Sequence, residues 1–210
     1  MTAPTIWLKP PGPVASGLRV GLLGGSFNPA HSGHLHVSEV AIKRLDLDYV
    51  WWLVSPQNPL KLVSGMAPLV RRMASARRIA GRCPRLRVSD IEHQMGTRYT
   101  IDAVVRLKER FPAVHFVWLM GSDNLLAFHR WRDWQRLVKT VPIAIVLRPG
   151  SNLAPLTARA TRQFSISEPG QTFPLSAPPA VTVLDAKRSD VSATSIRRQT
   201  LGWLKSIVLD

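Results

Sequence analysis

Cysteine, acidic residues and long apolar runs are scarce in this chain of 210 residues. The single cysteine, Cys83, excludes an intramolecular disulfide framework and a zinc site built from several cysteines. No apolar stretch approaches the roughly 18–20 residues that a membrane-spanning helix needs, and the first residues lack the charged-then-apolar order of a signal peptide. We therefore expect a cytoplasmic protein without a membrane partner.

Acidic residues are outnumbered by basic ones, because 28 lysines and arginines face 13 aspartates and glutamates, for a formal net charge of +15. Such a balance favours polyanionic partners, which include nucleic acids, acidic membranes and phosphorylated small molecules. Charge alone does not choose among them. The arginines of segments such as 71–82 are dispersed through helical sequence without an unbroken basic run. We interpret most of them as a solvated helix face.

Hydrophobic residues make up 45% of the chain, and short apolar runs alternate with segments of helical period. Strands are expected over 18–23, 49–54, 86–88, 115–120, 141–147 and 181–184. Helices are expected over 34–45, 69–80, 101–110, a segment around 131–138, and 195–205. This alternation predicts an α/β fold, namely a Rossmann-like, doubly wound, mostly parallel sheet with helices on both faces and a single domain.

Proline and glycine mark the limits of the expected domain. Residues 1–17 contain four prolines and two glycines, so we expect a flexible N-terminal lead without regular helix, followed by one domain over 18–210. Residues 149–180 also break the alternation with repeated prolines, which predicts a Pro-rich surface excursion within that domain.

The first expected strand runs directly into residues 24–35, which read G-G-S-F-N-P-A-H-S-G-H-L. In an open parallel sheet, ligands bind beyond the carboxyl ends of the strands, where a helix N-terminus offers N–H groups to phosphate. The glycines let backbone approach a ligand, and His31 and His34 can share one helix face. Two histidines can also bind a metal, but a third and fourth ligand are not evident, so we expect no protein-held metal.

Residues 24–35 resemble the H-x-G-H signature of the nucleotidyltransferases, in the form typical of bacterial nicotinate-nucleotide adenylyltransferases. The segment 191–197, V-S-A-T-S-I-R, is similar to the second signature of that superfamily. The resemblance implies adenylyl transfer from ATP to nicotinate mononucleotide, which forms nicotinate adenine dinucleotide and pyrophosphate in NAD biosynthesis. It implies that His31, His34 and Arg197 are catalytic, and places the active site at the carboxyl ends of the first and fourth strands.

Three more segments resemble the nicotinate branch, namely 58–61, 98–102 and 121–131. By resemblance, Asp123 holds a ribose hydroxyl of the adenosine half, while Thr100 and Trp131 line the nicotinate pocket. Taken alone, these residues also suit loop capping, helix N-capping and core packing respectively. The ATP-binding residues that the resemblance implies are Gly24, Gly25, Ser26, Phe27, Gly33, Lys61, Gly121, Asp123, Ser192 and Thr194.

The implied reaction needs no general base, because a phosphate monoester with a second pKa near 6 is largely a dianion at neutral pH. We expect Mg²⁺ to be carried with ATP rather than held by the protein, and an oligomer is possible. The alternative acceptors are nicotinamide mononucleotide and phosphopantetheine, although enzymes for the latter usually have threonine where this chain has His31. A basic nucleic-acid-binding protein is the non-enzymatic alternative, but Trp51 and Trp118 lie in strand-like runs and we expect no specific nucleic acid.

Overall fold

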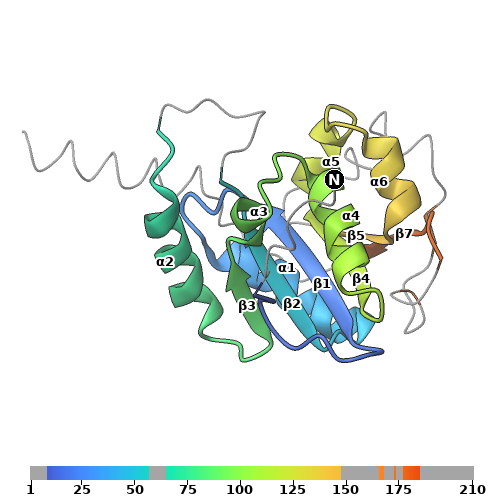
Figure 1. The fold of residues 1–210 in the computed structure, drawn as a ribbon, viewed down its shortest axis with the longest axis horizontal. Helices are drawn as coiled ribbons and strands as arrows, with labels where there is room; N and C mark the ends of the chain where they lie inside the picture. Colours follow the sequence, from blue (N-terminus) through green and yellow to red (C-terminus); the bar gives the residue numbers. More distant parts are fainter. Residues whose placement is uncertain (1–8, 57–64, 148–165, 168–172, 174–176, 185–210) are drawn as a thin grey trace, which may run out of the picture.

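The computed structural model describes residues 9–56, 65–147, 166–167, 173 and 177–184. These residues form a seven-stranded sheet of order β3-β2-β1-β4-β5-β7-β6, in which every pairing is parallel (Figure 1). The strands are β1 (Arg19–Gly25), β2 (Tyr49–Val54), β3 (Leu86–Ser89), β4 (His115–Gly121), β5 (Ile143–Val146), β6 (Ile166–Ser167) and β7 (Val181–Leu184). The expected Rossmann-like fold is confirmed.

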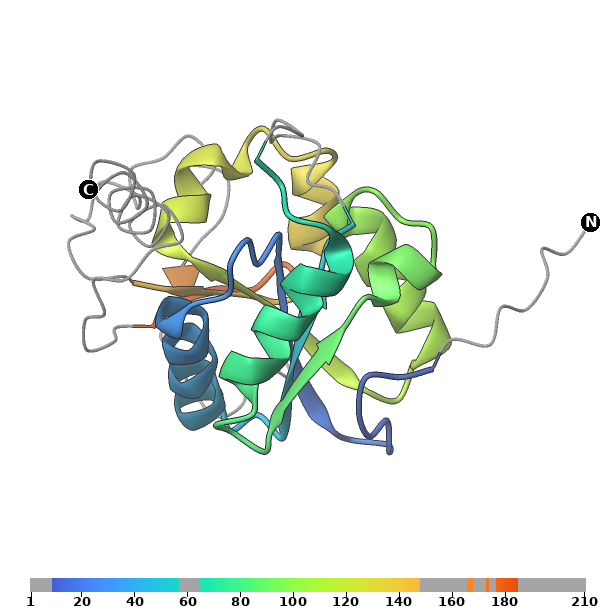
Figure 2. The ribbon, with the colours of Figure 1, turned by 90° about the vertical axis from the view of Figure 1, so that its left-hand side faces the viewer.

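Helices cover both faces of this sheet, and each face has its own apolar cluster. The helices are α1 (Ser32–Leu45), α2 (Leu69–Ala80), α3 (Ile91–Gln94), α4 (Thr100–Arg110), α5 (Ser122–Phe128) and α6 (Trp134–Thr140). α1 and α2 lie beside each other on one face (Figure 2). α3, α4, α5 and α6 contribute to the cluster on the other face.

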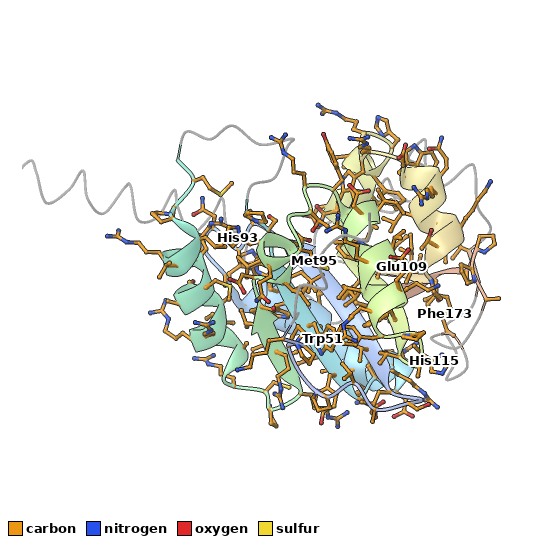
Figure 3. The ribbon with its side chains drawn as sticks, in the orientation of Figure 1. Trp51, His93, Met95, Glu109, His115 and Phe173 are labelled. Carbon is orange, nitrogen blue, oxygen red and sulfur yellow. The ribbon has the colours of Figure 1, made fainter. Side chains whose placement is uncertain are left out.

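Burial on both faces explains why β2 reads as an unbroken apolar run, which is typical of a central parallel strand. Successive side chains point to opposite faces. Trp51 packs against Phe111 and Phe116 on the α4 side, with ring centroids 6.1 and 5.6 Å away, and lies inside the molecule in Figure 3. Trp52 points to the α1 side, where its indole N–H donates to Ser38 Oγ at 2.8 Å.

Several element boundaries differ from the expected ones for local reasons. The prediction that Thr100 is the N-cap of α4 is wrong, because the Tyr99 carbonyl accepts the first helical bonds from Asp102 and Ala103 and makes Tyr99 the cap. α6 begins at Trp134 rather than near 131, since Asp133 has a left-handed backbone with φ of 48°.

Two further segments differ from the expectation or lie beyond its test. β5 is shorter than expected, because Pro142 has no N–H to donate and precedes the paired residues. The helix expected over 195–205 lies outside the described residues.

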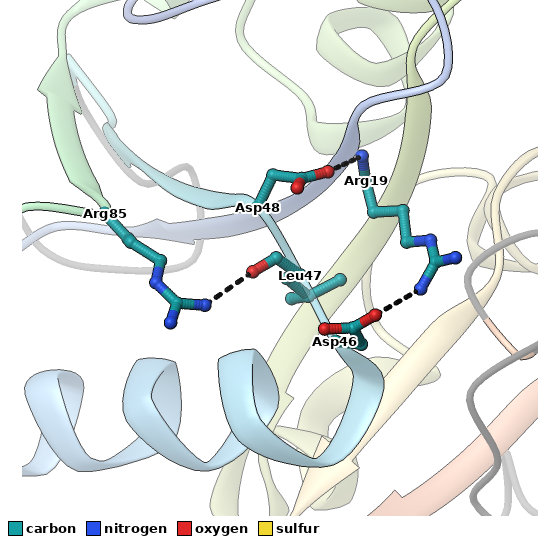
Figure 4. A network of polar contacts seen from close by, with 5 residues as sticks. All are labelled: Arg19, Asp46, Leu47, Asp48 and Arg85. Carbon is teal, nitrogen blue, oxygen red and sulfur yellow. Dashed lines mark hydrogen bonds and ion pairs between the residues drawn. The ribbon is translucent and has the colours of Figure 1, made fainter.

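A polar network closes the amino-terminal edge of the sheet (Figure 4). The Arg19 backbone N–H donates to Asp48 Oδ2 and its guanidinium to Asp46 Oδ2, both at 2.8 Å. Arg85 Nη1 donates to the Leu47 carbonyl at 3.3 Å, which joins the turn before β2 to the start of β3. His31, His34 and Asp123, which are expected to be functional, follow strands at the opposite, carboxyl edge.

The described part of the expected N-terminal lead contacts the domain. Val14 packs against the apolar cluster on the α4 side, and the Gly17 N–H donates to the Ala113 carbonyl at 2.8 Å. Within the described ranges, no helix combines the length and apolar composition that crossing a bilayer requires.

Candidate active site

The sheet changes its winding direction between β1 and β4, which are neighbours although β2 and β3 come between them in sequence. Ligands of doubly wound folds bind at such a switch point, beyond the carboxyl ends of the strands. β1 leads into the loop that carries His31 and His34, and β4 leads into Asp123 in the first turn of α5. The structure therefore brings the elements that carry His31, His34 and Asp123 to one edge of the sheet.

His31 and His34 begin helix α1 by capping it reciprocally. His31 is the N-cap residue with extended backbone, and its Nδ1 accepts the Gly33 N–H at 3.1 Å. The His31 backbone N–H donates in turn to His34 Nδ1 at 3.2 Å. The two ring centroids are 3.9 Å apart, and His31 is only 4% exposed. The paired histidines are thus held together by the backbone of the helix start.

This capping assigns the proton on each neutral imidazole. Because Nδ1 of both rings accepts a backbone N–H, the neutral ring carries its proton on Nε2. His31 and His34 thus carry Nε2–H groups at the N-terminus of a 14-residue helix, where the helix dipole favours an anion. Such an arrangement suits a phosphate group.

A buried layer of aromatic rings supports His34. Phe27 is 1% exposed, has a left-handed backbone with φ of 46°, and places its ring 4.6 Å from the His34 ring. Phe27 also stacks on Trp52 at 5.1 Å. Ser38, which accepts the Trp52 indole N–H, donates to the His34 carbonyl at 2.9 Å. Phe27 was expected at the ATP site, whereas Trp52 and Ser38 were not recognised from the sequence.

The two glycines at the end of β1 serve different purposes. A Cβ atom at Gly24 would lie 2.4 Å from Cη2 of Trp118, a ring that is 1% exposed and has no room to move. A Cβ atom at Gly25 would lie 3.5 Å from the Phe27 ring, which is an ordinary contact. Gly24 is therefore required by a neighbouring indole, not only by the approach of a ligand.

The expected nicotinate residues lie on the face covered by α4. Trp131 is half-buried and makes edge-to-face contacts with Trp118 and Phe128, at centroid distances of 6.1 and 5.4 Å. The Arg132 guanidinium lies over the Tyr99 ring at 4.5 Å. This contact brings the start of α4, where Thr100 is the first helical residue, next to the turn that carries Trp131.

Comparison with known proteins identifies the family. A family model described as cytidylyltransferase-like matches residues 22–199. The chain is 53% identical over 191 residues to a protein of Parvibaculum lavamentivorans named probable nicotinate-nucleotide adenylyltransferase, with 89% of this chain and 94% of the relative covered. A Cereibacter sphaeroides protein of the same name is 50% identical over 179 residues, which cover 85% and 96%. This chain belongs to the nicotinate-nucleotide adenylyltransferase family.

One solved structure of low sequence identity has a similar fold. The Plasmodium falciparum nicotinic acid mononucleotide adenylyltransferase, solved in complex with NaAD, has a TM-score of 0.66 and 18% identity, with 86% of this chain and 83% of that chain covered. At this identity the similarity shows the fold alone. It agrees with the parallel sheet of this chain.

Four expected residues of the adenylyltransferase site, Lys61, Ser192, Thr194 and Arg197, lie outside the described residues, and their roles stay predictions. The remaining ones lie at the carboxyl edge of the sheet or at the starts of the helices that follow it, except Trp131, which lies in the turn between α5 and α6. Ser26 is buried, the Gly33 N–H donates to His31 Nδ1, and Gly121 is the N-cap of α5.

Sequence reasoning missed Arg72, which it assigned to a solvated helix face. The side chain is 2% exposed and bonds to backbone carbonyls around the site. A signal for this burial exists in the sequence, because Arg72 is spaced four residues from Ala76 and eight from Ala80, both on the buried side of α2. The spacing was overlooked because an arginine is not usually counted among the buried residues of a helix.

Proposed function

We propose that this chain transfers the adenylyl group of ATP to nicotinate mononucleotide, forming nicotinate adenine dinucleotide and pyrophosphate. The observation that carries the proposal is the reciprocally capped pair of His31 and His34 at the start of α1, beyond the carboxyl end of β1. The names of relatives at 50% and 53% identity support the choice of acceptor.

In the proposed reaction, a 5′-phosphate oxygen of nicotinate mononucleotide forms a bond to the α-phosphorus of ATP. The bond from that phosphorus to the bridging oxygen breaks, and pyrophosphate leaves with the electron pair. The attacking phosphate is already ionised at neutral pH, so the enzyme positions the reactants and stabilises charge without removing a proton. The Nε2–H groups of His31 and His34 suit this task, and Arg197 is the third group that we assign to it.

Mg²⁺ enters the proposed reaction as part of the nucleotide substrate. Among the residues that the structure describes, no three His, Cys, Asp or Glu side chains are grouped to hold a metal ion. Triphosphate oxygens are hard ligands of the kind that Mg²⁺ prefers, and the ion usually keeps several waters. We therefore propose MgATP as the substrate, with charge on the leaving pyrophosphate shared between the ion and the histidines.

We assign recognition of the nicotinate carboxylate to the N-terminus of α4. The first N–H groups of this 11-residue helix can donate to both oxygens of a carboxylate. A carboxamide would present its NH₂ to those donors and leave one without a bond. Trp131 can stack on the pyridine ring of either substrate, because acid and amide share that face. We propose selection of the acid by α4 and retention of the ring by Trp131.

The proposal is tested by following pyrophosphate release from ATP with nicotinate mononucleotide, nicotinamide mononucleotide and phosphopantetheine in turn. We expect kcat/KM for the acid to exceed that for the amide at least about tenfold, since an unpaired buried donor costs about 1–3 kcal/mol. Trp131→Ala should lower both by similar factors. Equal use of acid and amide would indicate a dual-specificity enzyme, and release with phosphopantetheine alone would overturn the assignment of the acceptor.

A further inference from the structure

Arg72 holds three chain segments together at the carboxyl edge of the sheet. Its Nε donates to the Ala67 carbonyl at 2.8 Å, and Nη2 donates to the Pro56 carbonyl at 2.8 Å. Nη1 donates to the carbonyls of Ser26 and Ser55, each at 2.7 Å. These carbonyls belong to the loop after β1, the chain just after β2 and the residues that lead into α2.

Asn28 makes a second set of hydrogen bonds beside those of Arg72. The Asn28 Nδ2 donates to the Gly65 carbonyl at 2.9 Å, and its Oδ1 accepts the Ala67 N–H at 3.2 Å. The loop after β1 is therefore fixed at Ser26 through its carbonyl and at Asn28 through its side chain, both a few residues before the histidine pair. Ala67 takes part in both sets of hydrogen bonds, through its N–H with Asn28 and through its carbonyl with Arg72.

A buried guanidinium is a costly way to stabilise a fold. Burial lowers the pKa of Arg72, because the charged form loses its hydration. The one ion pair found in the described part of the chain joins Arg19 and Asp46 at the opposite edge, so Arg72 is balanced by carbonyl dipoles instead. Apolar residues often replace buried charges without loss of stability, which makes stability alone a weak explanation for this arginine.

The planar fork of the guanidinium suits the position of the carbonyls. Four N–H···O bonds to main-chain oxygens fix the spacing of three segments, which an ammonium on a flexible stem cannot reproduce. The positive charge of Arg72 also lies next to the loop after β1, because its guanidinium donates to the carbonyl of Ser26. Ser26 belongs to the loop that leads to His31 and His34. A positive charge behind a phosphate-binding loop favours an anionic substrate.

We infer that Arg72 is a positioning residue for adenylyl transfer: by fixing the Ser26 backbone against the chain after β2, it sets the place of the histidine pair relative to the bound triphosphate. The inference rests on the proposed function, because turnover is its readout. Arg72 acts through the loop, since four hydrogen bonds from its guanidinium go to main-chain carbonyls.

Two substitutions separate the geometry of Arg72 from its charge. Arg72→Lys keeps the charge but not the four bonds, and we expect kcat to fall about 10- to 100-fold, the effect of misplaced catalytic groups. Arg72→Met removes both, and we expect in addition a several-fold higher KM for ATP. Two matched controls come from the same helix: Arg71→Met at an exposed neighbour, and Met73→Ala, which removes buried apolar volume but none of the Arg72 hydrogen bonds.

Kinetics should be measured near 10 °C on the folded fraction of each variant, with circular dichroism and Tm as controls. Met73→Ala is expected to lower Tm while keeping kcat close to that of the unaltered enzyme. If Arg72→Lys also keeps its kcat once folded, Arg72 only stabilises the domain and the inference is wrong. If Arg72→Lys does not fold, Asn28→Ala provides the test, because it removes the neighbouring hydrogen bonds that hold the same loop. An unchanged kcat in Asn28→Ala would equally overturn the positioning role of Arg72.

Failure of the proposed function gives a different result. An unaltered enzyme that ignores nicotinate mononucleotide but uses another phosphate acceptor would refute that acceptor, and the Arg72 series would then be measured with the acceptor it does use. The expected kcat loss in Arg72→Lys does not depend on which acceptor attacks, because the fastened loop leads to the histidines that would contact ATP.

Discussion

Glu92 provides a test of the structure through the pH dependence of folding. The residue lies in α3, just after the carboxyl end of β3, and is 8% exposed. Burial raises the pKa of its carboxyl group from an ordinary value near 4.5 to about 7, because the charged form is deprived of water. The folded protein therefore binds a proton on Glu92 more tightly than the unfolded chain does.

The sign of the effect follows from this difference. Below pH 4.5 the carboxyl is protonated in both states and carries no penalty. As pH rises toward 7, only the unfolded chain releases the proton, so the stabilisation is lost and unfolding becomes easier. Each pKa unit corresponds to about 1.4 kcal/mol, which makes the loss about 3 kcal/mol above pH 7. For a chain of this size, that corresponds to roughly 6–12 °C in Tm.

Glu92→Gln keeps the shape of the side chain and removes its titration. We expect the Tm difference between the Glu92→Gln variant and the unaltered protein to become more favourable to the variant by several degrees between pH 4.5 and pH 8. Comparing two pH values cancels any constant cost of burying the amide. Glu109→Gln on the exposed side of α4, labelled in Figure 3, is the matched control for the same substitution at a solvent-exposed position. A pH-independent difference for Glu92→Gln would refute the reasoning.

Two further predictions concern His34 and the two glycines at the end of β1. His34→Ala should lower kcat by about 100-fold or more, the scale for loss of a transition-state donor, and should also cost about 1 kcal/mol because the helix cap is lost; turnover assays and Tm measure the two effects, and near-normal turnover in a folded variant would exclude His34 from catalysis. Gly24→Ala should cost about 1–3 kcal/mol through its clash with Trp118, whereas Gly25→Ala should be nearly neutral for folding; denaturant unfolding compares them, and equal losses would contradict the assigned packing.

The sheet was predictable wherever burial on both faces makes a strand apolar throughout. The expected strand over 49–54 coincides with β2 for this reason. α5 was not expected, because its buried residues, Ser122, Leu125 and Phe128, form too short a pattern to display a helical period. The start of α4 was displaced by one residue, since residue type favoured Thr100 as a cap while the backbone bonds select Tyr99.

The sequence predicts a candidate site where a recognisable residue type follows a recognisable turn, as at His31 and His34, whose catalytic role stays a prediction. The site was not predictable where a residue acts by supporting another. Ser38 and Trp52 support His34 through a chain of hydrogen bonds between elements, which one-dimensional spacing does not contain. Arg72 was misassigned because a charged residue on a helix is usually exposed, and only the tertiary structure supplies the four carbonyls that it binds.

Pairing of β1 with β4 determines when the site can be assembled during protein synthesis. Leu22 lies opposite Trp118 in the register, although the whole of the first half-sheet is translated between them. At about 5–20 residues per second, the ribosome adds Trp118 several seconds after Leu22. Until then Gly24 lacks the indole that packs over it, and β1 has no neighbouring strand on that side of the loop that carries His31 and His34. A nascent chain therefore carries His31 and His34 well before β4 completes that edge of the sheet.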